Sequence, residues 1–175
     1  MDVTIRLAEQ ADEEAVTKVL RRSITEVCYP DHQGDQDILS RWLANKTAPI
    51  VAQWLTSSQA FALVAVAGAR PVGIGMLSRS GEVLLCHVVP EVLGKGVGHR
   101  LLYALLTAAK EWKLERVFLE STATAKSFYL RNGFEPAGEP IVEGGMWGYP
   151  MQRRVTSSDS FNPTGFSAAA PKLAG

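Results

Sequence analysis

The chain has no excess of charge of either sign, and it has no long apolar run. Its 175 residues include 18 Lys or Arg and 18 Asp or Glu, so the formal net charge is zero. Because electrostatic binding to nucleic acid needs a basic surface, we expect no nucleic-acid partner. No stretch approaches the roughly 18 consecutive apolar residues of a bilayer-spanning helix, so we expect no membrane partner either.

Cysteine is also scarce. Only Cys28 and Cys86 are present, and they do not form a C-x-x-C pair. This pattern argues against a disulfide framework and against a zinc site, so we expect no metal. The N-terminal residues lack the basic start and apolar run of a signal peptide, and we therefore expect a cytoplasmic protein.

The composition that remains is that of a globular domain with a tail. Hydrophobic residues make up 46% of the chain, which is enough for a core. Residues 156–175 are rich in Ser, Ala, Pro and Gly and show little periodicity. We therefore expect one domain over residues 1–155 and a C-terminal tail over 156–175, which is either flexible or packs in part on the domain.

The spacing of apolar residues predicts both helices and strands. Three helices are expected in the first third of the chain, followed by three strands that form an antiparallel meander and then by a mixed segment. A short strand at 4–8 precedes the helices at 12–28, 38–43 and 47–55, the meander strands are 60–67, 72–78 and 82–89, and the mixed segment comprises helices at 97–113 and 123–132 with strands at 116–120, 134–136 and 147–155.

A glycine-rich linker lies between the last meander strand and the helix at 97–113. Gly94, Gly96 and Gly98 alternate with Lys95 and Val97. Glycines at such a junction let the backbone approach an anion, which the free amides of the helix start can bind. The spacing fits neither a P-loop nor a dinucleotide fingerprint. A glycine-rich turn without a ligand is the alternative.

Two segments together resemble the GNAT superfamily of acetyl-CoA-dependent N-acetyltransferases. The run from Val88-Val89-Pro90 through G-K-G-V-G resembles the family's pattern [QR]-x-x-G-x-[GA], with Leu93 in place of Gln or Arg. Residues 120–134 resemble its N-x-x-A-x-x-F-Y…GF motif, with Thr122 in place of Asn. The resemblance covers about residues 4–155 and is strongest over 82–134.

This resemblance implies an α+β fold with a mixed, mostly antiparallel central sheet flanked by helices. It also implies that acetyl-CoA is the co-substrate and that the acetyl group moves directly to a primary amine, which we expect to belong to a small molecule. The residues implied to bind acetyl-CoA are Gly94, Lys95, Gly96, Val97 and Gly98 around the pyrophosphate, His87, Val88 and Val89 beside the pantetheine, and Thr122 and Tyr129.

The resemblance assigns a catalytic role to Tyr129, as the acid that protonates the departing thiolate. The alternative is that Tyr129 only packs in the core beside Phe128. Glu82 is a candidate general base because a Glu stands four residues before a Cys, here Cys86, in the histone-acetylating branch of the family. Glu82 could equally be an exposed carboxylate, and His87, whose usual pKa is near 6.5, is a second candidate base.

The acceptor is not identified by the sequence. Carboxylates between Glu26 and Asp37 could attract a cationic amine at the mouth of the site, or they could belong to a solvated loop. Two other functions stay open, which are acetylation of a protein or peptide and a non-catalytic acyl-CoA-binding module. Association into a homodimer is also left open.

Overall fold

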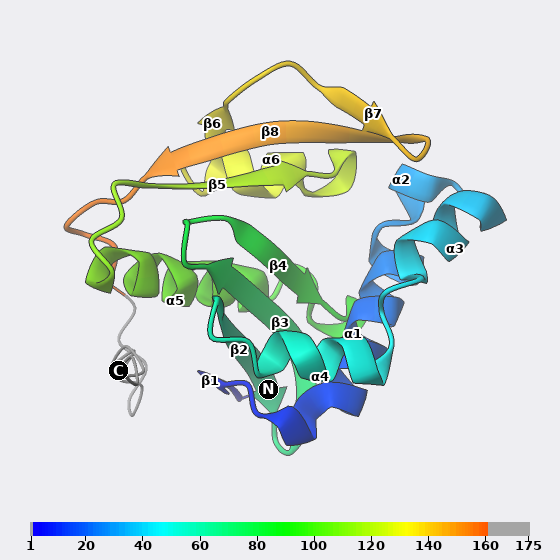
Figure 1. Ribbon diagram of the computed structural model, residues 1–175, viewed down its shortest axis with the longest axis horizontal. Coiled ribbons are helices and arrows are strands. Elements are labelled where there is room, and N and C mark those ends of the chain that lie inside the picture. Colours follow the sequence, from blue (N-terminus) through cyan, green and yellow to red (C-terminus); the bar gives the residue numbers. More distant parts are fainter. Residues whose placement is uncertain (1, 161–175) are drawn as a thin grey trace.

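The computed structural model describes residues 2–160, which form two sheets with helices on their faces (Figure 1). The first sheet has the strand order β1-β2-β3-β4, and each neighbouring pair is antiparallel. In the second sheet β8 lies between β5 and β6 and also pairs with β7. The strands are β1 (Val3–Leu7), β2 (Ala60–Ala67), β3 (Arg70–Ser78), β4 (Val83–Val88), β5 (Arg116–Ser121), β6 (Glu135–Pro136), β7 (Ile141–Glu143) and β8 (Met146–Arg154).

The two sheets are joined edge to edge at one parallel bridge. Glu82 bridges Phe118 beside the start of β4, and the amide of Phe118 donates to the carbonyl of Gly81 at 3.0 Å. Beyond this point β4 and β5 have no further pairing within residues 2–160, and Figure 1 shows them separating toward their C-terminal ends. The expected α+β class with a mixed, mostly antiparallel sheet is therefore confirmed.

Helices cover both faces of the first sheet, with α1 and α4 on one side and α5 on the other (Figure 1). The helices and short turns are η1 (Gln10–Asp12), α1 (Glu13–Arg22), η2 (Ser23–Val27), α2 (Tyr29–His32), α3 (Gln36–Leu43), α4 (Ala48–Leu55), η3 (Pro90–Val92), α5 (Val97–Glu111) and α6 (Ala123–Arg131). None of the helices within residues 2–160 is both long enough and apolar enough to cross a bilayer.

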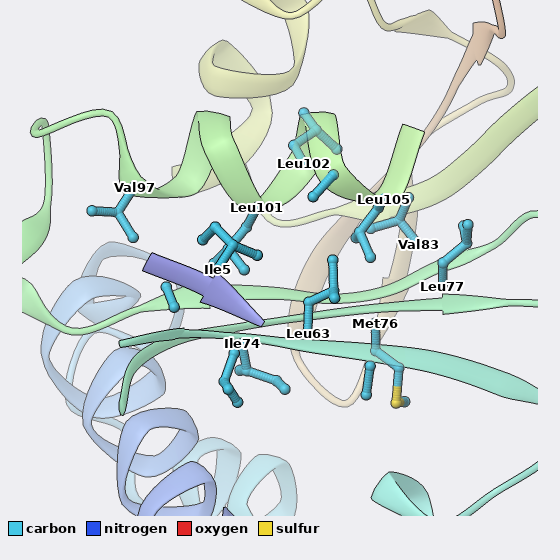
Figure 2. Packing of buried hydrophobic residues seen from close by; sticks show 14 of the residues in the cluster. Ile5, Leu63, Ile74, Met76, Leu77, Val83, Val97, Leu101, Leu102 and Leu105 are labelled. Atoms are coloured by element: carbon cyan, nitrogen blue, oxygen red, sulfur yellow. The ribbon is translucent and has the colours of Figure 1, made fainter. Parts of the chain in front are cut away.

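The core between α5 and the first sheet is closely packed. Figure 2 shows Leu101 and Leu105 of α5 directed at the strands, and both are fully buried. A Cβ atom on Gly73 would lie 2.9 Å from Leu101 Cδ1 and 3.1 Å from the carbonyl oxygen of His87. A glycine at this position of β3 thus lets α5 sit close to the sheet, which positions the glycine-rich linker that precedes α5.

The structure adds elements that hydrophobic spacing does not predict. The expected helix over 12–28 is interrupted, because α1 ends at Arg22 and continues as a single π-helical turn, η2. The polar link after it contains the short helix α2, and the exposed strand β7 precedes β8. Such short or exposed elements bury too few apolar side chains to produce a periodic signal.

The C-terminal segment begins with residues that pack on the domain. Asp159 is almost fully buried and pairs with Arg153 of β8 at 2.8 Å, and the Lys110 ammonium donates to the carbonyl of Ser157. The part of the expected tail over 156–160 is therefore ordered against β8 and α5, while the part over 161–175 lies outside the described residues.

Candidate active site

The separation of β4 and β5 opens a cavity of about 1250 Å³. One wall is β4, and the opposite wall is the end of β5 with α6. Residues of η2, of α3 and of the turn between β7 and β8 also line the cavity, and so do Gly94 and Gly96 of the glycine-rich linker. The cavity therefore brings together four segments that are far apart in the sequence.

The glycine-rich linker has the conformation that an anion site needs. Gly94 and Gly96 have φ angles of 72° and 79°, a region that favours glycine, and Gly96 is the N-cap of α5. The first helical bond runs from the Arg100 amide to the Gly96 carbonyl, so the amides of the three preceding residues have no acceptor inside the helix. These amides and the helix dipole together favour a phosphate group at this end of the cavity.

The unpaired edge of β4 presents backbone groups to the cavity. The amide of Val89 donates to the carbonyl of Val72 at 2.9 Å and is therefore not free. Val88, opposite Gly73, is a non-hydrogen-bonded position of the antiparallel ladder, so its amide and carbonyl point away from β3 and toward the gap. The backbone amide that is available to the pantetheine is therefore that of Val88, while a contact with other atoms of Val89 stays a prediction.

Tyr129 is buried in α6 and faces β4 across the cavity. Its ring lies 5.1 Å from that of Phe128 and 5.3 Å from that of Phe134, between centroids. Burial, together with the nearby thiol of Cys86, raises the pKa of Tyr129 well above its usual value near 10. The phenol therefore stays protonated at neutral pH and can donate a hydrogen bond into the cavity.

Cys86 is the current partner of the Tyr129 hydroxyl. The thiol donates to the carbonyl of Gly98 at 3.8 Å, and its sulfur is near enough to the Tyr129 hydroxyl for each group to affect the pKa of the other. Burial raises the pKa of the Cys86 thiol to about 12, although the bond from Tyr129 acts in the opposite direction. Cys86 is thus a neutral thiol that links the glycine-rich linker to Tyr129, and it is not an activated nucleophile.

His87 lies on the other face of β4, because neighbouring strand residues point to opposite sides. Its Nδ1 atom lies 3.0 Å from the hydroxyl oxygen of Ser23, which is buried in the π-helical turn η2. In that turn the Cys28 amide bonds to the Ser23 carbonyl five residues back. The bond to Ser23 fixes the ring of His87, which lines the cavity.

The pKa of His87 is lowered to about 4, mainly by burial and also by the positive charge of Lys46. His87 is therefore a neutral imidazole at physiological pH. It can accept a proton or a hydrogen bond, but it is a weak base as long as the charge of Lys46 faces it uncompensated.

The remaining expected residues divide into two groups. Thr122 lines the cavity as the N-cap of α6, where its hydroxyl oxygen accepts the amide of Ala125 at 3.2 Å. Glu82, in contrast, lies at the closed end where the two sheets meet, and it is not brought together with Tyr129 or His87. The side chains of Lys95 and Val97 are also outside the described walls, since Lys95 is exposed and Val97 is buried in the core.

The acidic link before α3 has mainly structural contacts. The Asp31 carboxylate accepts the amide of Thr124 at 3.1 Å, in the first turn of α6. The Asp35 carboxylate caps α3 by accepting the amides of Asp37 and Ile38. Both carboxylates thus stabilise helix N-termini, while the Oδ2 atom of Asp31 is buried without a hydrogen-bond partner among the described residues. That these carboxylates attract a cationic acceptor stays a prediction.

Ser23 and Lys46 line the cavity but are not among the site residues expected from the sequence. Ser23 occupies a polar position on the otherwise apolar face of the first helix, and this mismatch is a signal that could have identified it. Lys46 follows α3 in a polar segment and gives no such signal. Its burial depends on α3, α4 and η2 folding around it, which no local pattern indicates.

The sequence also matches known proteins. Residues 31–155 match the model of a family described as an acetyltransferase (GNAT) domain. Over 78 residues the chain is 37% identical to the amino-acid acetyltransferase of Mycobacterium tuberculosis (strain ATCC 25618 / H37Rv), a segment that is 42% of this chain and 44% of that protein. The matched part is therefore less than half of that relative's length.

Solved structures share the fold at low identity. The PaiA N-acetyltransferase from Thermoplasma acidophilum, solved in complex with coenzyme A, is 21% identical, with 88% of this chain and 99% of that chain covered and a TM-score of 0.74. A GCN5-related N-acetyltransferase from Rhodopseudomonas palustris is 20% identical, with 88% and 96% covered and a TM-score of 0.78. At these identities the likeness concerns the fold.

Proposed function

The chain belongs to the GNAT family of acetyl-CoA-dependent N-acetyltransferases, and we propose that its acceptor is the primary amine of a small molecule. The observation that supports catalysis at this site is the cavity between β4 and β5, which has free helix-start amides at one part of its wall and His87 with Tyr129 at another. An amine and an acyl donor can meet in such a cavity.

The residues of the cavity fit the donor. The amides around Gly96 and Gly98 would hold the pyrophosphate, and the free backbone of Val88 would bond to the pantetheine arm or to the thioester carbonyl. Acetyl-CoA supplies an acetyl group activated as a thioester. A backbone amide directed at the carbonyl oxygen stabilises the negative charge that develops there during attack.

His87 would accept the proton of the amine, and Tyr129 would donate to the departing thiolate. The amine must lose a proton to attack, and His87 is a neutral acceptor held in position by Ser23. The departing thiolate must be stabilised, and the protonated phenol of Tyr129 can donate to it in place of Cys86. Tyr129 comes from α6 and His87 from β4, so the acid and base functions belong to two separate side chains.

The contact between α3 and the β7–β8 turn supports a small molecule over a peptide. The Arg41 guanidinium of α3 donates to the carbonyl of Gly144 at 3.0 Å, which ties the β7–β8 turn to the helix. A Cβ atom on Gly145 would lie 3.0 Å from Ile38 Cδ1, so turn and helix are in close contact. The name of the curated relative, an amino-acid acetyltransferase, agrees with a small acceptor.

An acetyl-transfer screen tests this proposal. The purified chain is given acetyl-CoA with a panel of small amines and with peptides that have free N-termini or lysines, and release of free thiol is followed. We expect turnover with one or more small amines and none above background with peptides. Preferred turnover of a peptide would refute the small acceptor, and acetyl-CoA binding by calorimetry without any turnover would refute catalysis.

A further inference from the structure

Lys46 is a buried cation in the wall of the cavity. It lies between α3 and α4, and only 8% of its surface is exposed. Its ammonium donates to the Trp42 carbonyl at 3.2 Å and to the Asn45 side-chain oxygen at 2.5 Å, and it lies 5.7 Å from the centre of the Trp54 ring. All of these partners are neutral. No carboxylate among residues 2–160 forms an ion pair with it.

A buried ammonium without a counter-ion is unfavourable for folding. Taking a charge out of water costs free energy that neutral hydrogen-bond acceptors offset only in part. Burial accordingly lowers the pKa of Lys46. Arg41, the neighbouring cation of the cavity wall, is exposed to solvent and has no such cost. The position of Lys46 therefore suits an anion that enters the cavity from solution.

The place of Lys46 indicates which ligand supplies that anion. Lys46 lines the same cavity as His87 and as Ser23, whose hydroxyl oxygen lies 3.0 Å from the His87 ring nitrogen, and the charge of Lys46 contributes to the lowered pKa of His87. The glycine-rich linker lies on the opposite face of β4 from His87, where Gly98 accepts from Cys86. The phosphate site of the donor and the ammonium of Lys46 are thus on different sides of the strand, and Lys46 faces the acceptor.

We propose that Lys46 binds a carboxylate of the acceptor, so that the enzyme acetylates amines that also carry a carboxyl group. This inference rests on the proposed function. Two further charges of the cavity fit such a molecule, because Glu120 of β5 and Glu143 of β7 are exposed, line the same cavity and can attract its ammonium. A bound carboxylate would also offset the charge that Lys46 exerts on His87, and so strengthen His87 as a proton acceptor.

The test compares acceptors that differ only in the carboxylate. Amino acids and their primary carboxamides are supplied with saturating acetyl-CoA to the wild type, to Lys46→Met and to Lys18→Met. Met keeps the length of the side chain and removes the charge, and Lys18 is an exposed control on α1. The ratio of kcat/KM between acid and amide is formed for each variant, so that the intrinsic reactivity of each amine cancels between variants.

We expect the wild type and Lys18→Met to prefer the acid at least tenfold, and Lys46→Met to lose that preference through a higher KM for the acid. Acetyl-CoA affinity by calorimetry and the melting temperature should not fall in Lys46→Met. An equal loss with acid and amide would assign Lys46 a structural role, and a loss of acetyl-CoA affinity would assign it to the donor; either result overturns the inference.

The wild type alone provides a second check that does not depend on a folded variant. Amides or simple alkylamines that are acetylated as well as acids would overturn the inference and leave the proposed function intact. Turnover of no amine at all, with acetyl-CoA still bound, would overturn the proposed function and this inference together.

Discussion

The substitution Tyr129→Phe separates a catalytic hydroxyl from a packing ring. It removes one oxygen atom and leaves the contacts of the ring with Phe128 and Phe134 in place. The neighbouring polar group is the Cys86 thiol, which keeps its own contact with the Gly98 carbonyl. The loss in folding stability should therefore be that of one hydrogen bond, about 0.5–1.5 kcal/mol, or a few degrees in melting temperature.

The expected loss in rate is larger than this structural effect. General acid catalysis is worth roughly 10²–10⁴-fold, which corresponds to about 3–5 kcal/mol in the activation barrier. The raised pKa of Tyr129 opposes complete transfer of its proton to a thiolate, so we expect the hydroxyl to act mainly by donating a hydrogen bond as the sulfur departs. That places the loss toward the lower end of the range.

The assay is a single turnover with enzyme in excess over acetyl-CoA, followed by thiol release. This condition removes product release, which can mask the chemical step. Cys86→Ala serves as the control, because it removes the partner of the hydroxyl but keeps the phenol; we expect its rate to stay within a few-fold of wild type. A Tyr129→Phe enzyme with the wild-type single-turnover rate would falsify the acid assignment and leave Tyr129 as a packing residue.

Three other changes have definite expected outcomes. Gly96→Ala places a side chain at a φ of 79°, where no neighbouring atom would clash with it. The fold should survive with a loss of about 1–2 kcal/mol in stability, while the affinity for acetyl-CoA, measured by calorimetry, should fall at least tenfold. Unchanged affinity would argue against the phosphate site. Asp31→Asn weakens the carboxylate that accepts the amide of Thr124, so the melting temperature should fall by an amount corresponding to about 0.5–2 kcal/mol, and a changed KM for the acceptor without a thermal shift would contradict this. The Arg6 guanidinium lowers the pKa of Asp12, so this pair should stabilise the fold above the usual carboxyl pKa and lose its effect as the pH falls through the lowered value. Asp12→Asn should then reduce the loss of folding stability that acid causes, measured by unfolding at a series of pH values. The same loss in the variant as in the wild type would refute the contribution.

Much of the fold follows from hydrophobic spacing. The strand β2 (Ala60–Ala67) and the start of α5 at Val97 are predicted to the residue, and α6 and β5 to within one residue. These segments bury a continuous apolar face, and burial of such a face is what the spacing reports. Gly133 follows α6 with a φ of 81°, a conformation that is typical of the glycine just after a helix.

The site was predictable only where it depends on local backbone conformation. The linker around Gly96 is determined by its glycines, and it has the expected form. The availability of a β4 amide depends instead on which residues pair with β3, so the sequence alone could not separate Val88 from Val89. Likewise the alternation of side chains along β4 predicts which face of the sheet Glu82 occupies. It does not reveal that the two sheets are still joined at Glu82, through its bridge to Phe118.

The π-helical turn η2 shows why the acceptor side is the hardest part to predict. The extra residue in this turn rotates the side chains that precede it about the helix axis relative to those that follow it. In this chain Ser23 is thereby directed toward His87. It also frees the carbonyl of Ile24, which accepts a bond from the buried ring of His32, and the chain then continues into α2 and α3. Lys46 follows α3 in the chain. A single irregular turn in an apparently regular helix therefore helps to place both His87, through its bond to Ser23, and Lys46, the two polar groups that we assign to the acceptor.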